Sequence, residues 1–492
     1  MAKRAIVWLI AALAALVGAS AAAANVPLTR VSTDPFTNPT SQHATELEPD
    51  TFAFGSTVVS AFQVGRFFGG GASDIGFATS HDGGTTWTHG FLPGMTTSSG
   101  APGSPFEAVS DASVAYDAKH GTWLISSIPI LPNGGAVPTV FVNRSTDGGA
   151  TWSTPVSMPP PAAKVVDLDK NWTVCDNHPA SPFYGSCYTE LDNFGEGDVE
   201  LMSTSTDGGR TWSVPIPTAG RDKGLGGQPV VQPSGRVVVP FEALNGTISS
   251  FVSDNGGQSW SHAVKVAGVR SHAVAGGLRT SSLPSAEIAA DGRVYVAWQD
   301  CRFRVKCASN DIVFSTSGDG LTWTAPARIP IDAASSTVDH FIPGLAVDPA
   351  TSGGATHLAL TYYFYPNAAC TQATCRLTAG YISSPDAGAH WGTATQLAGP
   401  MALSDIAQTS QGPMVGDYIS TSFVAGGKAT TTIAVGRPHV LDQPFDEAMY
   451  APTAPLAVAS PAQAVNAASS GAVVAPVTGI GTGETHHAVR ED

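Results

Sequence analysis

The octapeptide Ser145 to Trp152, with the sequence STDGGATW, decides the fold of this 492-residue chain. Its Asp and Ser side chains suit bonds to nearby backbone N–H groups, and glycine supplies the positive φ that a tight turn needs. The tryptophan can pack such a turn against a sheet. We therefore expect the octapeptide to form the corner of a β-hairpin. Related octapeptides stand at residues 80–87, 205–212, 253–260, 316–323 and 384–391.

The spacing of these octapeptides sets the size of the repeating unit. Their tryptophans stand at residues 87, 152, 212, 260, 323 and 391, so successive copies lie 48 to 68 residues apart. That length suits a four-stranded sheet with loops, which is one blade of a β-propeller. Alternating apolar and polar residues at 293–298 and 311–315 fit half-buried strands. The sequence predicts an all-β fold, a β-propeller of four-stranded antiparallel blades.

The pattern S-x-D-x-G-x-x-W resembles the Asp-box, or BNR repeat, of the sialidase-like superfamily, and the resemblance covers roughly residues 45–440. It implies that each box joins the third and fourth strands of a blade, so that the box turns all lie on one face. Ligand sites would then lie on the opposite face, around the axis. Three further segments resemble secreted bacterial Asp-box proteins: DK-x-W at 169–172, SP-x-x-G at 181–185 and GDY at 416–418.

The chain ends bear on the number of blades. Strand-like runs at 414–420 and 430–435 follow the sixth box, and residues 26–31 resemble a strand without a partner in its own blade. Pairing these ends would close a seventh blade and remove free sheet edges. Seven blades are therefore favoured, and six, the number that the resemblance to sialidases implies, is the alternative.

The termini differ in composition from the repeats. Residues 1–24 carry Lys3 and Arg4, an apolar run and small residues that end at Ala24. This pattern predicts a signal peptide cleaved near Ala24 and a secreted protein, with an N-terminal membrane anchor as the alternative. No other apolar run is long enough to span a membrane. The predicted propeller occupies 25–440, and residues 441–492, rich in Ala, Pro and Val, predict a disordered tail.

The pairing of the cysteines and the net charge of the chain limit the kinds of ligand and partner that we expect. Six cysteines form three close pairs, for which disulfides are the simplest interpretation after export and zinc is the alternative. The pairs are Cys175 with Cys187, Cys301 with Cys307, and Cys370 with Cys375. A net charge of −15 disfavours nucleic acid and anionic membranes as partners. We expect a monomer that acts on a glycan.

Candidate site residues follow from the loops expected opposite the boxes. A glycosidase needs two carboxylates across a cleft, one of them with a raised pKa. The sialidase resemblance adds a Tyr nucleophile and arginines that bind a substrate carboxylate. For each carboxylate, a structural role at a strand end is the alternative. The candidate catalytic residues are Asp111, Glu190, Glu242, Asp300, Tyr363 and Tyr418. The candidate substrate-binding residues are Arg66, Asp169, Lys170, Arg279, Arg302, Arg304, Tyr365 and Asp417.

These observations predict a secreted glycoside hydrolase for an acidic or complex glycan. The alternative is a non-catalytic propeller that binds a glycan or a protein. After Glu242, Ser249 and Ser250 stand where a sialidase would carry an arginine, which argues against sialic acid as the substrate. No metal or cofactor is expected, although Asp167-Leu168-Asp169 offers carboxylates for a weak calcium site.

Overall fold

The computed structural model describes residues 26–101, 103–440, 444–460 and 465–466. In these ranges the chain forms β-strands and five single 3-10 turns, without an α-helix, so the predicted all-β fold is confirmed. The predicted signal peptide lies outside the described residues. Within them, no helix is long and apolar enough to cross a membrane.

Antiparallel sheets follow one another in chain order. The first contains β2 (Glu46–Phe54), β3 (Thr57–Arg66), β4 (Ala72–Ser80) and β5 (Thr88–Phe91). The second contains β6 (Ala108–Asp117), β7 (Thr122–Ile130), β8 (Phe141–Ser145) and β9 (Val156–Ser157), and the pair Ala72 and Val109 bridges it to the first. The third contains β10 (Leu168–Cys175), β11 (Cys187–Asn193), β12 (Val199–Ser205) and β13 (Ile216–Pro217).

The next three sheets repeat this order. The fourth contains β14 (Gly224–Leu225), β15 (Val230–Val231), β16 (Val237–Ala243), β17 (Thr247–Ser253) and β18 (Val264–Gly268). The fifth contains β19 (Ser285–Ile288), β20 (Val294–Asp300), β21 (Asp311–Ser317) and β22 (Ala327–Arg328). The sixth contains β23 (Asp339–Val347), β24 (Leu358–Tyr365), β25 (Leu377–Ser384) and β27 (Thr395–Met401).

Shorter elements lie in the loops within these sheets and between them. Two strand pairs are β26 (His390–Trp391) with β34 (Val465–Asn466), and β28 (Gln408–Thr409) with β29 (Gly412–Pro413). The 3-10 turns are η1 (Phe194–Glu196), η2 (Ala275–Gly277), η3 (Val305–Cys307), η4 (Gly353–Ala355) and η5 (Leu403–Asp405).

The two ends of the chain meet in the last sheet. A hairpin of β30 (Thr421–Val424) and β31 (Lys428–Thr431) leads into β32 (Ile433–Gly436), which pairs with β33 (Glu447–Pro452). The N-terminal strand β1 (Leu28–Arg30) pairs with the other edge of β33. β33 lies inside the segment that the sequence assigned to a disordered tail, and this corrects the boundary at residue 440. Its residues are buried between two partner strands, a context that their composition does not reveal.

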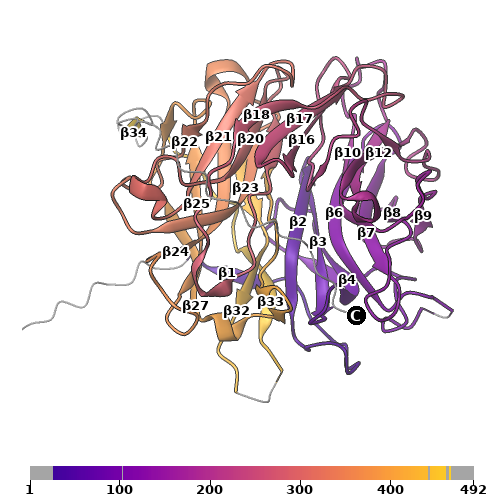
Figure 1. Cartoon of the computed structure of the whole chain (residues 1–492), viewed down its shortest axis with the longest axis horizontal. Coiled ribbons are helices and arrows are strands. Elements are labelled where there is room, and N and C mark those ends of the chain that lie inside the picture. The colour runs from indigo at the N-terminus through magenta and orange to yellow at the C-terminus, as the bar shows by residue number, and fades with distance from the viewer. Residues whose placement is uncertain (1–25, 102, 441–443, 461–464, 467–492) are drawn as a thin grey trace, which may run out of the picture.

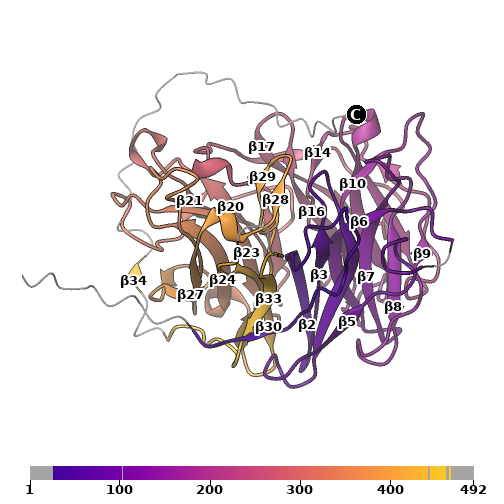
Figure 2. The ribbon, with the colours of Figure 1, turned by 90° about the horizontal axis from the view of Figure 1, so that it is seen from below.

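The sheets form a ring through their first strands. β2 contacts β6, and the contacts continue through β10, β15, β19, β23 and β30, which returns to β2. Figures 1 and 2 show the indigo first sheet beside the yellow last sheet. The apolar core is divided among the spaces between successive sheets. One cluster joins Val59 and Ile75 to Val114 and Ile125, and another joins Val238 to Val296.

Each Asp-box turn is held by its own side chains. In the second box, Ser145 Oγ donates to Asp147 Oδ1 at 2.7 Å, and Gly149 N donates back to Ser145 Oγ at 2.9 Å. The Thr151 backbone N–H donates to Asp147 Oδ1 at 3.0 Å. Gly148 and Gly149 both have positive φ, of 81° and 85°, which their lack of a Cβ permits. The predicted hairpin corner is therefore confirmed for this box.

The boxes also attach each sheet to the one before it. Trp152 of the second sheet packs against Phe77 of the first, with ring centroids 5.7 Å apart. Thr79 Oγ1 of the first sheet donates to the Gly149 carbonyl at 2.8 Å. Trp391 of the sixth sheet packs on Phe314 of the fifth in the same way. The box residues are thus occupied by structural contacts.

We expect the Asp147→Asn variant to lose a pH-dependent part of the stability. Bonds from Thr151 hold the pKa of Asp147 at about 2, below the value of about 3.9 for an unfolded chain. The carboxylate therefore stabilises the fold above pH 4, and this contribution disappears as the pH falls from about 4 to about 2. Thermal unfolding followed by circular dichroism should show a lower Tm for the variant at pH 7 and a smaller deficit at pH 3.

The fourth box supplies the reverse test, because Asn255 occupies the Asp position there. Asn255→Asp should acquire the same dependence on pH. A deficit of Asp147→Asn that stays constant from pH 7 to pH 3 would contradict the carboxylate role.

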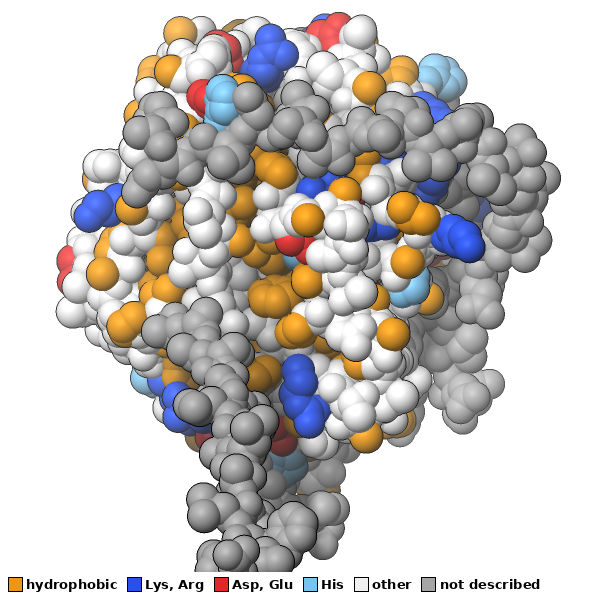
Figure 3. Space-filling view, turned by 90° about the vertical axis from the view of Figure 1, so that its left-hand side faces the viewer, with side chains coloured by type: hydrophobic (Ala, Val, Ile, Leu, Met, Phe, Trp, Pro, Cys, Tyr) orange, Lys and Arg blue, Asp and Glu red, His pale blue; other side chains and the backbone are white. Residues whose placement is uncertain are grey.

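The disulfides form between the predicted cysteines, and the surface carries few charged side chains. The three predicted pairs, Cys175–Cys187, Cys301–Cys307 and Cys370–Cys375, are all bonded. Only 13% of the residues are charged. Figure 3 accordingly shows a face on which uncharged side chains predominate and charged ones are scattered.

Candidate functional site

The first strands of four sheets carry a β-bulge at the end opposite the boxes. The register shifts between Leu47 and Asp50 in β2, between Ser110 and Ser113 in β6, between Asp169 and Trp172 in β10, and between Phe341 and Gly344 in β23. In each bulge one non-glycine residue has a left-handed backbone. These residues are Glu48 (φ 59°), Asp111 (φ 51°), Lys170 (φ 38°) and Ile342 (φ 50°). Bulges redirect side chains, and strained backbone of this kind concentrates at functional sites.

Three of the redirected side chains are charged, and they meet. Lys170 Nζ lies 3.0 Å from Asp111 Oδ1, 2.6 Å from Asp417 Oδ2 and 3.8 Å from Glu48 Oε1. Arg279 completes the group, because its Nε donates to Asp417 Oδ1 at 2.7 Å. We call Glu48, Asp111, Lys170, Arg279 and Asp417 the Lys170 cluster.

Neighbouring side chains hold the cluster in place. The Asp417 backbone N–H donates to Glu48 Oε1 at 3.0 Å, and the Tyr418 hydroxyl donates to the Ala112 carbonyl at 3.1 Å. The Tyr418 ring lies 5.8 Å from Lys170 Nζ and packs edge-on against Trp172. Burial lowers the pKa of Arg66 to about 10, and the positive charge of the nearby Arg279 contributes to this shift.

The carboxyl groups in the cluster and beside it have pKa values that are shifted in opposite directions. Burial raises the pKa of Glu48 to about 7, although Lys170 opposes it. Burial would also raise the pKa of Asp417, but the charges of Arg279 and Lys170 hold it well below its usual range. Burial and the nearby Asp111 raise the pKa of Asp169 to about 6. Carboxyl groups whose pKa values diverge in this way can divide acid and base roles.

Solvent reaches only part of this site. Lys170, Asp111 and Glu48 are buried, whereas Asp169, Trp172 and Arg279 are partly exposed. The central pocket is lined by Lys170, Trp172, Glu190 and Tyr418 and holds about 10 Å³. That volume is about the space one water needs. A ligand larger than a water molecule would therefore contact the exposed edge of the cluster, where Trp172 offers an aromatic surface.

A row of carboxyl groups continues across the third sheet. Asp169, Asp192 and Glu200 stand directly opposite one another on β10, β11 and β12, and Glu190 lies on the same face. Like charges in such positions repel. Burial raises the pKa of Glu190 and of Asp192 well above the usual range, and it raises the pKa of Glu200 to about 8. Glu190 also lines the central pocket.

We expect this row to make the protein less stable in mild alkali. The folded pKa of Glu200, about 8, exceeds the value of about 4.3 for an unfolded chain. Stability should therefore fall as the pH rises between these two values. Urea denaturation at pH 5 and pH 8 should show that Glu200→Gln reduces the difference between the two midpoints. Glu107→Gln, at a partly exposed carboxylate, is the control and should leave the difference unchanged. An equal difference in wild type and Glu200→Gln would refute the prediction.

Two predicted tyrosines lie in the packing between sheets. The Tyr363 hydroxyl donates to the Ala434 carbonyl at 2.9 Å, and Tyr363 and Tyr365 are both fully buried in one apolar cluster. Burial raises the pKa of each phenol well above its usual range. The structure gives neither ring a surface for a sugar, so these two predictions of site roles are corrected. Strand β24 places alternate rings against neighbouring sheets, a contact that the sequence alone does not show.

Other predicted residues form local structural contacts. Arg302 Nε donates to Asp300 Oδ1 at 2.9 Å, and Trp298 Nε1 donates to Asp300 Oδ2 at 3.2 Å. These contacts fix the loop that the Cys301–Cys307 disulfide closes. Glu242 lies on β16, where burial raises its pKa to about 7 and the Ser282 backbone bonds its carboxyl group. None of these residues joins the Lys170 cluster in the described part of the chain, so Arg66 and Arg279 are the candidate arginines that lie near each other.

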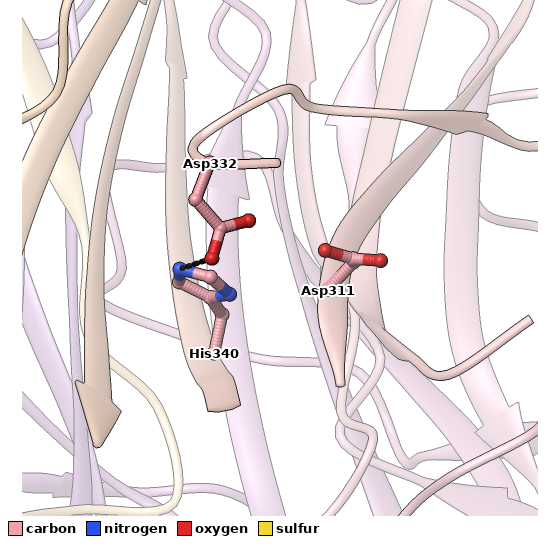
Figure 4. A group of neighbouring side chains, drawn as sticks. All are labelled: Asp311, Asp332 and His340. Carbon is pink, nitrogen blue, oxygen red and sulfur yellow. Dashed lines mark ion pairs between the residues drawn. The ribbon is translucent and has the colours of Figure 1, made fainter. Parts of the chain in front are cut away.

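Arg304 belongs to a second buried network. Its guanidinium forms ion pairs with Asp311 at 2.6 Å and Asp332 at 2.7 Å, and Arg328 contacts the same two carboxylates. Figure 4 shows His340 beside Asp332, at 3.9 Å, with Asp311 facing them. Two aspartates and a histidine could bind a metal ion. Here two guanidinium groups already neutralise the carboxylates, so we interpret the network as a structural brace for the fifth and sixth sheets.

Two contributors were missed by the sequence analysis. Glu48 was not among the candidate site residues, and Trp172 was included only as part of the DK-x-W segment. The φ > 0 conformation at the bulge gives Glu48 its direction, and a bulge has no sequence signature here. The carboxylates Asp167 and Asp169, suggested for calcium, are held by separate backbone contacts. The Val137 amide donates to Asp167, and the Lys170 amide donates to Asp169.

Comparisons with known proteins place the chain in a family. Residues 68–344, more than half of the chain, match the model of the BNR repeat-like domain. The chain belongs to this family. No curated protein matches this BNR repeat-like chain.

Solved structures with similar folds have low identity to this BNR repeat-like chain. A protein of unknown function from Dyadobacter fermentans is 18% identical over 73% of this chain and 99% of its own, with a TM-score of 0.47. A Hadza microbial sialidase is 18% identical over 65% of each chain, with a TM-score of 0.45. The NanB sialidase from Streptococcus pneumoniae is 13% identical over 86% of this chain and 70% of its own, with a TM-score of 0.42.

Proposed function

We propose that this protein is an extracellular glycoside hydrolase with a seven-bladed propeller, whose active site is the exposed edge of the Lys170 cluster. The observation that carries the proposal is the set of carboxyl groups around one buried lysine, whose pKa values are shifted in opposite directions. The ring of first strands and the closure of the last sheet by β1 support the count of seven blades. Three disulfides support export to an oxidising compartment.

In the proposed reaction, Asp169 is the general acid. Its pKa of about 6 and partial exposure suit a group that must be protonated and must reach the substrate. Asp169 donates its proton to the glycosidic oxygen as the bond to the anomeric carbon breaks. Asp111, which is buried and paired with Lys170, is the carboxylate that accepts a proton from the attacking water. Trp172 stacks on the sugar ring, and Arg279 binds an acidic group of the glycan.

A panel of fluorogenic sialosides, uronides and arabinosides tests this proposal. Turnover of an acidic glycoside by the full chain, with loss of turnover in Asp169→Asn, is the expected result. Absence of turnover across the panel, with intact folding, would contradict the hydrolase.

A glycan-binding propeller without catalysis is the second candidate, and the size of the central pocket favours it. A space of about 10 Å³ does not admit a sugar ring. Glycan retention on an array without product would support this candidate and overturn the first.

A further inference from the structure

A second cavity lies against the fourth sheet and shares no lining residue with the central pocket. It holds about 250 Å³. Its walls come from β16, β17, the start of β18 and the loop that leads into β14. The lining residues are Asp222, Lys223, Phe241, Ala243, Asn245, Thr247, Ser249, Ala263 and Lys265. The cavity lies at the end of the β16–β17 hairpin, away from the fourth box.

One wall is a line of polar side chains along β17. Thr247 Oγ1 donates to Asn245 Oδ1 at 2.6 Å, and the Thr247 and Ser249 hydroxyls lie 2.8 Å apart. Residues two apart on a strand face the same side, so Thr247 and Ser249 form a ladder on β17, and Asn245 in the preceding turn extends it. Because the Thr247 proton is donated to Asn245, the Ser249 proton is donated to Thr247, and the hydroxyl lone pairs that remain can accept hydrogen bonds from the hydroxyls of a sugar ring.

The cavity is positively charged in an acidic protein. The chain has only eight lysines and a net charge of −15, yet two of the lysines line this one cavity. Lys223 and Lys265 are exposed, and neither forms an ion pair with the residues that the structure describes. The Lys223 ammonium donates to the Glu196 carbonyl at 3.1 Å, which leaves two of its protons for a ligand.

Asp222 is the acidic residue in the cavity wall, and it does not neutralise the two lysines through an ion pair. Asp222 Oδ2 accepts from Thr218 Oγ1 at 2.7 Å and from the Ala263 backbone N–H at 3.0 Å. These bonds hold the Asp222 carboxylate against the backbone that joins the two sheets. The ammonium groups are therefore the charged donors available to a ligand.

We propose that this cavity binds one acidic sugar residue, with its carboxylate between Lys223 and Lys265 and its ring hydroxyls along the β17 ladder. A volume of about 250 Å³ is just below the range of about 300–1,000 Å³ for small-molecule pockets, which suits a single ring. The ladder favours a carboxylated sugar over an inorganic anion, which has no ring hydroxyls to place there. The site is independent of the proposed hydrolase, because it needs no reaction.

Isothermal titration of the full chain with glucuronate tests the proposal. Glucose supplies the ring without the charge, and inorganic phosphate supplies the charge without the ring. We expect saturable binding of glucuronate that weakens when sodium chloride is raised from low to high concentration. Glucose and phosphate should each bind at least about tenfold more weakly, since each lacks one set of charged or hydroxyl contacts.

Variants locate the bound sugar. The double variant Lys223→Met/Lys265→Met should weaken glucuronate binding at least about tenfold, and Ser249→Ala about fivefold, as the loss of one hydrogen bond implies. Lys428→Met, at the exposed start of β31, is the matched control and should bind as wild type does. Asp169→Asn should also retain binding, because Asp169 lies in the other site.

Three results would overturn the proposal. They are an absence of saturable binding, equal affinity for phosphate and glucuronate, and binding that survives the double lysine variant. Loss of binding in Asp169→Asn would assign the sugar to the Lys170 cluster instead. Loss of hydrolysis with intact glucuronate binding would contradict only the hydrolase.

Discussion

Replacing Lys170 with methionine should lower the free energy of unfolding by about 3–5 kcal/mol, the usual cost of removing one partner from a buried ion pair. Asp111 and Asp417 both contact the Lys170 ammonium, and all three side chains are almost fully buried. Asp417 keeps its contacts with Arg279, but Asp111 has no other ion-pair partner among the described residues. The variant would therefore leave one carboxylate buried without a counter-charge.

The midpoint of urea denaturation at pH 7 measures this effect, and a second substitution isolates its cause. Lys170→Met/Asp111→Asn removes the uncompensated charge and should recover part of the lost stability. Lys428→Met again serves as the control at an exposed lysine. A midpoint for Lys170→Met that equals the wild-type value would show that the cluster does not stabilise the fold.

Replacing Asp169 with asparagine should reduce kcat on a responsive glycoside by about 10²–10⁴-fold, the contribution of a general acid. Asparagine keeps the oxygen that accepts from the Lys170 amide at 2.9 Å, so the local backbone should be retained. Because Asp169 acts in its protonated form, wild-type kcat/KM should fall as the pH rises through about 6.

Measuring the activity of Asp169→Asn over a range of pH distinguishes a catalytic role of Asp169 from a role in stability. The falling limb near pH 6 should be absent from the residual activity of Asp169→Asn. Asp254→Asn, at an exposed ion pair with Arg236, should keep the wild-type profile. A variant that retains the wild-type kcat would exclude Asp169 as the acid.

Local sequence predicted those parts of the fold that local contacts stabilise. Within one box, Ser145 and Asp147 bond the turn that contains them, so eight residues carry the whole signal. The sequence did not predict β33 because its burial depends on two partner strands. One partner is β1, which lies about 420 residues earlier in the chain, and the other is β32, the strand that precedes β33. Nothing in the composition of 447–452 reports those partners.

The candidate site was likewise predictable only in part, because contacts between distant residues are not visible in the sequence. Asp111, Lys170 and Asp417 were predicted from their places at blade junctions, and they do meet. Their separations of 59 and 247 residues contain no information about the ion pairs that join them. Tyr363 and Arg304 have suitable chemistry, but the packing of neighbouring sheets encloses both. Residue type selects candidates, and only the three-dimensional arrangement separates exposed groups from enclosed ones.

The pairing of β1 with β33 has a consequence for biosynthesis. Because the first strand of the fold completes the sheet that is made last, the ring cannot close while the ribosome is still producing the C-terminal region. A nascent chain that stops before β33 would expose the unpaired edges of β1 and β32, which favour aggregation. Folding intermediates with open edges should therefore persist until β33 has been synthesised and has paired with β1 and β32.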